Sequence, residues 1–359
     1  MDSLHLISDD RINDKARGCI VGGAIGDALG YPVEFIPSFE EIVLRYGDDG
    51  ITEFDLGFGN LYGHHKPSAI FSDDTQMTLY TMEGLAASLL HELPLIPTVC
   101  NAYVAWWSGQ MAKKVKISYE SNLSRIVELN QRRAPGNTCM SALQAIHNGK
   151  EPANLSKGCG GVMRVAPFGL YGAVKGLLPT ETGRIAGEAA ELTHLHPLST
   201  YSSALLAILI QLSITGTVTD LVSFNQTLSE LLETVEKIYG SEAPHMDEFK
   251  AIIRKASNLA SNELRDWEII ENGLGEGWVA EEALAISIFS VLRHFHNIED
   301  CLVCAVNHGG DSDSTGALTG NIIGAIHGYD SLPDKFKGEL QLLDVLLEQT
   351  DRFLQAIRE

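Results

Sequence analysis

The stretch NHGGDSDSTGALTG, residues 307–320, places two carboxylates, Asp311 and Asp313, among glycines and hydroxyl side chains. Side chains two positions apart on an α-helix point in roughly opposite directions, so these carboxylates cannot converge from a helix interior. The preceding glycines permit unusual backbone angles, and Asp and Ser are favoured at helix N-termini. We therefore expect Asp311 and Asp313 in a loop or at the first turn of a helix.

A second stretch, FSDDTQMTL at residues 71–79, has the same design. Ser72 suits the N-cap position, and Asp73 and Asp74 would lie in the first turn, at the positive end of the helix dipole. Two well-capped helices are one interpretation, because an acidic residue in the first turn gains about 0.3–1 kcal/mol. Paired carboxylates and glycine-rich surroundings in both stretches exceed what capping requires, which favours one shared site.

Four carboxylates at one site need a source of positive charge. Two unit charges about 4 Å apart repel by about 4 kcal/mol at an effective dielectric constant of about 20. Two divalent cations would balance the four carboxylates, with the hydroxyls of Ser72 and Ser314 or waters completing the ligand shells. All-oxygen ligation points to a hard ion, Mg²⁺ or Mn²⁺, before Zn²⁺. Such ions lower the pKa of a bound water, which suits hydrolysis.

The elements that must position these residues are helices. Apolar residues recur at helical spacing almost everywhere, whereas two-residue alternation is rare. The pattern predicts an all-α protein, a compact multi-helix bundle with a dozen or so helices, and residues 47–68 form an ordered loop with at most a short strand. Helical runs cover residues 75–93, 98–111, 182–196, 199–215, 219–238, 247–262, 279–295 and 338–357.

Glycines recur every four residues near both ends of the chain. They are Gly18, Gly22, Gly26 and Gly30, and then Gly316, Gly320, Gly324 and Gly328. Because glycine costs about 1 kcal/mol against alanine inside a helix, eight of them need an offsetting gain. Such stripes let another backbone approach closely, so we expect two central helices packed tightly around a site. Close packing without a site is the alternative.

Composition and charge narrow the class of protein. The chain has 359 residues, 45% of them hydrophobic and 20% charged, as in soluble globular proteins. With 26 basic and 47 acidic residues its formal net charge is -21, and no basic run exceeds two residues. We therefore expect no non-specific nucleic-acid binding. No apolar run reaches about 18 residues and the N-terminus lacks a targeting pattern, so we expect a cytoplasmic protein without a membrane span.

The six cysteines lie mostly in apolar or glycine-rich surroundings, as expected of free thiols in a reducing compartment. Cys301 and Cys304 form a CxxC motif without a second pair. Core packing is the preferred interpretation of this motif, and metal or redox use is the alternative.

Six motifs in order resemble those of the ADP-ribosylglycohydrolase family, over about residues 14–330. They are GCIVGGAIGDALGYPVEF (18–35), FSDDTQMTL (71–79), GNTCMSAL (136–143), GCGGVMRVAPFGL (158–170), THLHP (193–197) and HGGDSDSTGALTGNIIGA (308–325). The resemblance implies a compact all-α fold and a binuclear Mg²⁺ centre that binds ribose hydroxyls beside the scissile bond. It implies, as metal ligands, Ser72, Asp73, Asp74, Asp311, Asp313 and Ser314.

The resemblance also assigns catalytic and substrate-binding residues. Asp73 is our first choice for orienting or deprotonating the attacking water, and Glu34 is the second. Glu34 lies where relatives carry a mobile acidic residue, although a solvated glutamate is the alternative. The glycine-rich stretch 157–164 fits close approach of a diphosphate. The expected substrate contacts are Asn137, Thr138, Gly158, Gly160, Gly161, Met163 and His194. For Asn137 a helix cap, and for His194 a buried structural role, are the alternatives.

These residues predict a Mg²⁺-dependent hydrolase that removes ADP-ribose from arginine side chains of proteins. Serine-linked ADP-ribose, O-acetyl-ADP-ribose and ADP-ribosylated nucleic acid are alternative substrates, because the motifs read the ADP-ribose half. Residues 14–359 would form one domain. Residues 1–13, which are acidic, would form an extension, either frayed or able to enter the cationic cleft of a cognate ADP-ribosyltransferase, as an antitoxin or immunity protein would. A family member that has lost catalysis is disfavoured by the intact acidic clusters.

Overall fold

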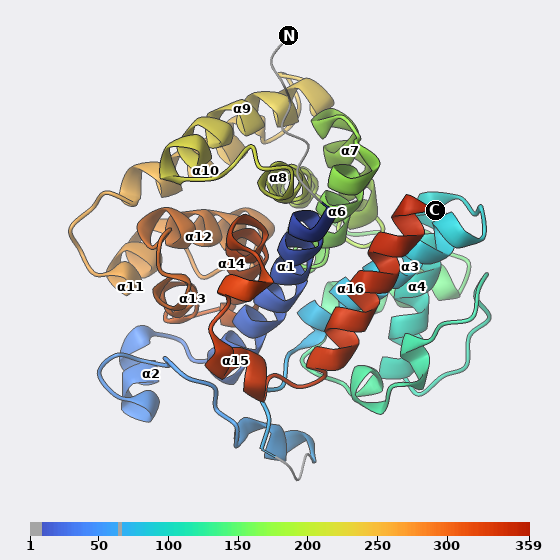
Figure 1. Cartoon of the computed structure of the whole chain (residues 1–359), viewed down its shortest axis with the longest axis horizontal. Coiled ribbons are helices and arrows are strands. Elements are labelled where there is room, and N and C mark those ends of the chain that lie inside the picture. The colour runs from blue at the N-terminus through green and yellow to red at the C-terminus, as the bar shows by residue number, and fades with distance from the viewer. Residues whose placement is uncertain (1–8, 64–66) are drawn as a thin grey trace.

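The computed structural model describes residues 9–63 and 67–359, and these residues form sixteen α-helices and no strand. The all-α prediction is confirmed (Figure 1). The helices are α1 Asp9–Gly30, α2 Phe39–Tyr46, α3 Asp73–Leu90, α4 Leu95–Gln110, α5 Asn137–His147, α6 Ala166–Lys175, α7 Pro179–Glu191, α8 Pro197–Ile214, α9 Leu221–Tyr239, α10 Met246–Leu259, α11 Asp266–Ile269, α12 Ala280–Arg293, α13 Ile298–Val306, α14 Ser312–His327, α15 Asp334–Glu339 and α16 Leu343–Arg358.

Helices α1 and α14, from opposite ends of the chain, lie side by side at the centre (Figure 1). Their glycine stripes face each other, as predicted. A Cβ added at Gly26 would lie 1.9 Å from the carbonyl oxygen of Gly316, and one added at Gly320 would lie 1.9 Å from that of Gly22. Alanine at these positions would push the two backbones apart. The glycines therefore set the distance between α1 and α14, and the start of α14 carries the second acidic stretch.

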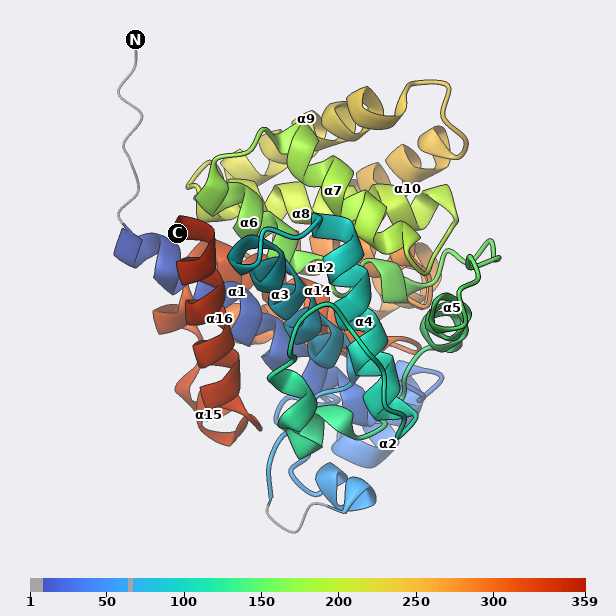
Figure 2. The same ribbon diagram turned by 90° about the vertical axis from the view of Figure 1, so that its right-hand side faces the viewer.

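Other helices surround this pair. Helices α3 and α16 pack on one side, α8 and α12 pack on the other, and α9 and α10 form an outer layer over α8 (Figures 1 and 2). Among the described residues α8 is the one helix long and apolar enough to cross a membrane. Because 89% of that stretch is buried inside the fold, α8 has the surroundings of a core helix.

Two predicted helical runs end differently in the structure. The run 182–196 is helical only to Glu191, and Pro197 begins a new helix, α8, after His196 in the extended conformation that a following proline favours. The run 338–357 is interrupted between α15 and α16, where Leu342 adopts a left-handed φ of 58°. Spacing of apolar residues alone does not reveal such breaks, since the pattern continues across them.

The ends and the long loop refine two further expectations. Helix α1 already begins at Asp9, so residues 9–13 of the predicted extension are its first turns, and Asp9 lies 3.4 Å from Arg358 of α16. Residues 1–8 lie outside the described residues, as do 64–66 of the predicted loop. Within that loop the chain forms a 3₁₀ turn, η2 Phe58–Tyr62, and Ala69 makes an isolated parallel bridge with Leu340.

Candidate active site and metal centre

The first acidic stretch begins helix α3 as predicted. Ser72 is the N-cap, and its Oγ accepts a hydrogen bond from the Asp74 N–H at 3.2 Å. Asp73 and Asp74 occupy the first turn and are buried. Asp27 of α1 accepts from the Ser72 N–H at 2.7 Å, from the Thr75 N–H at 3.0 Å and from the Thr75 hydroxyl at 2.5 Å. A carboxylate from the central helix therefore fixes the start of α3.

The second acidic stretch begins helix α14. Asp311 is its N-cap residue and Asp313 lies in its first turn, as the two-residue spacing required. The preceding Gly310 has a φ of 124°, a conformation that favours glycine, and a Cβ there would lie 2.0 Å from the Glu276 carbonyl oxygen. The Asp311 N–H donates to that same oxygen at 2.8 Å. The loop is thereby held against the segment before α12.

The two stretches meet, although they are far apart in the sequence. The Ser314 hydroxyl donates to Asp74 Oδ2 at 2.7 Å, which joins the starts of α14 and α3 directly. Both helix starts line a cavity of about 210 Å³, which we call the acid cavity. The predicted site residues that line it are Glu34, Asp73, Asp74, Asn137, Thr138, Gly158, Gly160, Met163, His194, Asp311, Asp313 and Ser314.

Glu34 joins this group from the end of α1. It follows the 3₁₀ turn η1, Tyr31–Val33, and is only 6% exposed, so the structure does not make it a solvated glutamate. One oxygen each of Glu34, Asp311 and Asp313 lie within 4.8 Å of one another. The turn is held by Tyr31, whose hydroxyl bonds that of Tyr62 in the long loop. That loop therefore positions Glu34.

The charges in the acid cavity fit divalent cations. Three aspartates, Asp73, Asp74 and Asp311, have pKa values well above the ordinary value for Asp. The main cause is burial, and the second is repulsion by Asp313. Oε2 of Glu34 and Oδ2 of Asp311 are buried without a hydrogen-bond partner. Unpaired oxygens among mutually repelling carboxylates are what hard cations neutralise. The acidic groups can therefore hold metal ions, and their donor atoms are oxygens.

The glycine-rich loop forms the opposite wall. Gly158 and Gly160 line the cavity before and within the turn η5, Cys159–Gly161. Gly158 makes an isolated antiparallel bridge with Val279, and the Cys159 N–H donates to the Trp278 carbonyl at 3.1 Å. The segment 276–279 thus touches both the glycine-rich loop and the start of α14. It ties the two walls of the cavity together.

Two predicted residues do not line the cavity. A Cβ added at Gly161 would lie 2.2 Å from Ser199 Oγ, so Gly161 serves the packing of the loop against α8 instead of facing a substrate. The Ser72 hydroxyl is used as the cap of α3 and is fully buried. Its role as a metal ligand therefore stays a prediction.

The other predicted substrate contacts surround the glycine-rich loop. Asn137 is exposed and is the first residue of α5 after its N-cap, Gly136, so it is not the cap. Thr138 donates from its hydroxyl to Ser156 Oγ at 3.0 Å. His194 is 2% exposed, and burial followed by the nearby Arg164 lowers its pKa to about 3, so it is neutral at physiological pH. Its Nδ1 bonds the Thr193 hydroxyl at 2.9 Å.

The two nitrogens of the His194 ring have different surroundings, and its contact with a substrate stays a prediction. Its Nε2 faces the glycine-rich loop, because a Cβ added at Gly160 would lie 3.2 Å from that atom. Nδ1 is satisfied within the protein, while the other side of the ring lines the cavity. A neutral ring fixed at one nitrogen can present the other to a ligand.

Three functional candidates were missed by sequence reasoning. Asp27 lies inside the first motif, in GDALG, and a polar residue amid an apolar helix was a usable signal. Cys159 and Trp278 line the acid cavity, but nothing in their local sequence marks them. Trp278 is 37% exposed and stacks on Phe35, which is 69% exposed, with ring centroids 5.8 Å apart. An exposed aromatic pair therefore stands beside Glu34 at the acid cavity.

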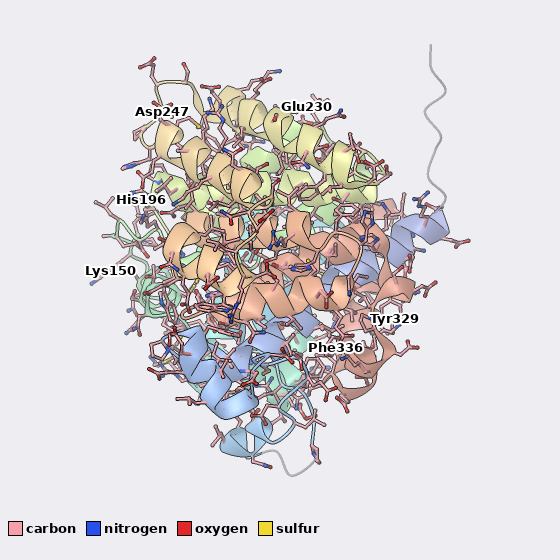
Figure 3. The ribbon with its side chains drawn as sticks, turned by 90° about the vertical axis from the view of Figure 1, so that its left-hand side faces the viewer. Lys150, His196, Glu230, Asp247, Tyr329 and Phe336 are labelled. Carbon is pink, nitrogen blue, oxygen red and sulfur yellow. The ribbon has the colours of Figure 1, made fainter. Side chains whose placement is uncertain are left out.

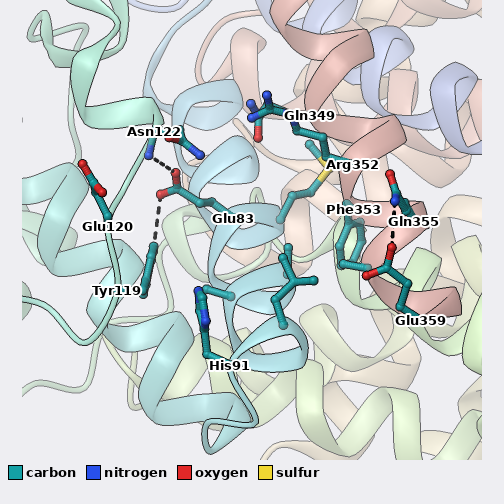
Figure 4. A pocket seen from close by; sticks show the side chains of 15 residues that line it. Glu83, His91, Tyr119, Glu120, Asn122, Gln349, Arg352, Phe353, Gln355 and Glu359 are labelled. Atoms are coloured by element: carbon teal, nitrogen blue, oxygen red, sulfur yellow. Dashed lines mark hydrogen bonds between the residues drawn. The ribbon is translucent and has the colours of Figure 1, made fainter.

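A separate hollow lies between α3, α16 and the loop after α4 (Figure 4). Its buried carboxylate, Glu83, is saturated: it accepts from the N–H groups of Asn122 at 2.7 Å and Leu123 at 3.1 Å, and from the hydroxyls of Ser121 at 2.7 Å and Tyr119 at 3.3 Å. None of the predicted site residues lines it. The acid cavity is therefore the candidate active site.

Comparison with known proteins agrees with this geometry. A family profile described as ADP-ribosylglycohydrolase matches residues 8–359. The chain belongs to the ADP-ribosylglycohydrolase family. The ADP-ribosyl-[dinitrogen reductase] glycohydrolase of Rhodospirillum rubrum is 28% identical over 349 residues, which cover 95% of this chain and 94% of that protein. Human ADP-ribosylhydrolase ARH3 is 23% identical over 374 residues, which cover 96% and 92%.

A solved structure has the same fold as this ADP-ribosylglycohydrolase. A chain of an ADP-ribosylglycohydrolase-related protein complex matches it with a TM-score of 0.65 at 21% identity, over 97% of this chain and 99% of the other. Family membership makes the protein a hydrolase of ADP-ribosyl linkages, and the family acts on ADP-ribosylated proteins. The sequence resemblance is thereby confirmed.

Proposed function

We propose that this ADP-ribosylglycohydrolase cleaves the N-glycosidic bond between ADP-ribose and arginine side chains of proteins, and that it requires Mg²⁺. The observation that carries the proposal is the acid cavity. Carboxylates from the end of α1, the start of α3 and the start of α14 converge there, opposite a glycine-rich loop. The name of the Rhodospirillum relative, which acts on an ADP-ribosylated protein, supports the substrate class.

The residues of the acid cavity divide into three roles. Two Mg²⁺ ions, with Mn²⁺ as a substitute, would bind ribose oxygens and activate a water. Their ligands would be Asp73, Asp74, Asp311, Asp313 and Ser314, with Ser72 as a further candidate. Asp73 or Glu34 would take the proton of the attacking water, and the backbone amides of the loop 158–160 would receive the diphosphate.

The aromatic pair at the acid cavity supports arginine as the leaving group. Phe35 follows Glu34 in the chain and stacks on Trp278, which lines the acid cavity, and both side chains are partly exposed. A guanidinium is planar and cationic, and it stacks on aromatic faces with a gain of about 0.5–1 kcal/mol at exposed sites. Serine and acetyl leaving groups carry no such planar cation. Carboxylates near the same opening add attraction for a cation.

A hydrolysis panel tests the proposal. Purified protein is given arginine-linked, serine-linked and nucleic-acid-linked ADP-ribose, each with Mg²⁺ or with a chelator. We expect ADP-ribose to be released from the arginine-linked substrate, and only when Mg²⁺ is present. Trp278→Ala should raise KM for this substrate about threefold or more, because the stacking energy of the guanidinium is lost. The KM for a slowly cleaved serine-linked substrate should stay unchanged. Faster release from serine than from arginine, or release in chelator, would contradict the proposal.

A further inference from the structure

A second group of metal-ligand side chains lies outside the acid cavity. Asp266, His294 and Cys304 each offer one ligand atom, and these three atoms lie within 4.8 Å of one another. They come from the start of α11, the C-terminal cap of α12 and the last turn of α13. Figure 3 shows this face of the molecule, on which the blue α2 lies below the orange helices α11, α12 and α13.

The group opens into a cavity of its own, of about 420 Å³. This cavity and the acid cavity share no lining residue among the described residues. Asp48, Asp49 and Asp300 also line it, against Arg265 as the basic residue of its wall. The surroundings of the three ligand atoms are therefore negative, which attracts a cation.

The carboxylate of the group is held in place before any ligand arrives. Asp266 Oδ1 accepts from Arg293 Nε at 2.9 Å, while Oδ2 lies 2.7 Å from His294 Nε2. The guanidinium of Arg293 also donates to the carbonyls of Ala260, Asn262 and Leu264, so it fixes the chain that leads into Asp266. Metal-ligating carboxylates are commonly oriented by such outer partners.

The chemistry of the donors separates this group from the acid cavity. A thiol, an imidazole and a carboxylate form the mixed sulfur, nitrogen and oxygen set that binds Zn²⁺ and its neighbours in the transition series, whereas Mg²⁺ prefers oxygen alone. An ion pair between Asp266 and His294 explains two of these residues. Cys304, whose thiol also hydrogen-bonds Asp266, adds a buried sulfur in the same place.

We propose that Asp266, His294 and Cys304 form a site for a transition metal of the Zn²⁺ class, separate from the acid cavity. The protein supplies three ligands, and water from the 420 Å³ cavity takes the fourth position. Binding releases the thiol proton of Cys304 to solvent, and the metal binds His294 through Nε2, with the proton of the neutral imidazole on Nδ1. The metal joins the starts and ends of three helices, one of which, α13, leads into the loop before Asp311.

Cobalt binding to the full-length protein tests this proposal. After dialysis against a chelator, Co²⁺ is titrated and the near-ultraviolet absorption of a cobalt–thiolate bond is followed. We expect a band that saturates at one thiolate-bound ion per chain and disappears when Zn²⁺ is added. Absence of a thiolate band in the wild-type protein would overturn the proposal, whatever the protein's hydrolytic activity.

Three cysteine variants locate the sulfur. Cys304→Ser should abolish the band, whereas Cys301→Ser, one helical turn away on α13 and also buried, should retain it. Cys159→Ser should retain it too, which excludes a contribution from the acid cavity. A band that survives Cys304→Ser contradicts the site. His294→Gln, with folding checked by circular dichroism, should raise the Kd for Co²⁺ more than about tenfold, because loss of an outer partner alone costs about 10–100-fold.

Discussion

Glu34 differs from the aspartates around it in how it is held. The aspartates lie at the starts of α3 and α14, whereas Glu34 follows the short turn η1 outside both helices; like Asp311, it has a buried oxygen without a hydrogen-bond partner. A carboxylate that is not tied by hydrogen bonds within the protein can accept a proton from a water beside it. Asp73 was our first choice for this step from the sequence, and the structure leaves both residues at the cavity wall.

We expect Glu34→Gln to separate proton transfer from metal binding. If Glu34 takes the proton of the attacking water, kcat should fall about 100-fold or more, while the Kd for Mg²⁺ measured by calorimetry should change only about threefold. Asp73→Asn should weaken Mg²⁺ binding strongly. Glu41→Gln, exposed on α2, is the matched control. Near-normal turnover of Glu34→Gln would assign the proton to Asp73.

Among the elements, the pair α1 and α14 carries the greatest constraint. The start of α14 supplies Asp311 and Asp313, and α1 supplies Asp27, which fixes the start of α3. Because the two helices touch backbone to backbone, their glycines determine how closely these groups meet.

Gly320→Ala should therefore destabilise the protein. The added Cβ would lie 1.9 Å from the Gly22 carbonyl oxygen, so the helices must separate, and overpacking of this kind typically costs about 1–3 kcal/mol. Urea unfolding measures the change. The matched control is Gly338→Ala in α15, where a Cβ meets nothing within 4 Å and should instead stabilise by up to about 1 kcal/mol. Equal unfolding midpoints for Gly320→Ala and the wild-type protein would show that close approach is dispensable.

For the whole molecule, the buried carboxylates make stability depend on pH and on metal together. Burial, followed by repulsion from Asp313, raises the pKa of Asp27 to about 7, and burial raises that of Asp73, Asp74 and Asp311. In the unfolded chain these groups titrate near about 3.9. A raised pKa in the folded state stabilises the protein fully below the unfolded value, and this stabilisation is lost as pH rises through the folded value.

The metal-free protein should consequently be less stable at pH 8 than at pH 5. Added Mg²⁺ should raise the thermal unfolding midpoint more at pH 8 than at pH 5, because at low pH protons compete for the same oxygens. Thermal unfolding in chelator and in Mg²⁺ at each pH measures both effects. In the double variant Asp311→Asn/Asp313→Asn, the difference between the Mg²⁺-induced increases of the unfolding midpoint at pH 8 and pH 5 should shrink. An equal Mg²⁺ increment at both pH values would speak against metal binding by this cluster.

Local features of this protein could be predicted from the sequence. Helical periodicity, the cap at Ser72 and the four-residue spacing within each glycine stripe depend on neighbours within a few turns, and spacing alone excluded a helix interior for Asp311 and Asp313. The errors of the prediction from sequence were local as well. Leu342 interrupts the predicted helical run 338–357, although the apolar pattern continues across it.

Which distant groups meet depends on the tertiary structure. Four contacts depend on packing between segments far apart in the chain. They are the hydrogen bond of Ser314 with Asp74, the anchoring of the α3 start by Asp27, the close approach of Gly161 to Ser199, and the stacking of Trp278 on Phe35. The grouping of Asp266, His294 and Cys304 arises in the same way. Such contacts leave no periodic signal, because they follow from the distance and orientation of packed helices and not from the spacing of residues along one of them.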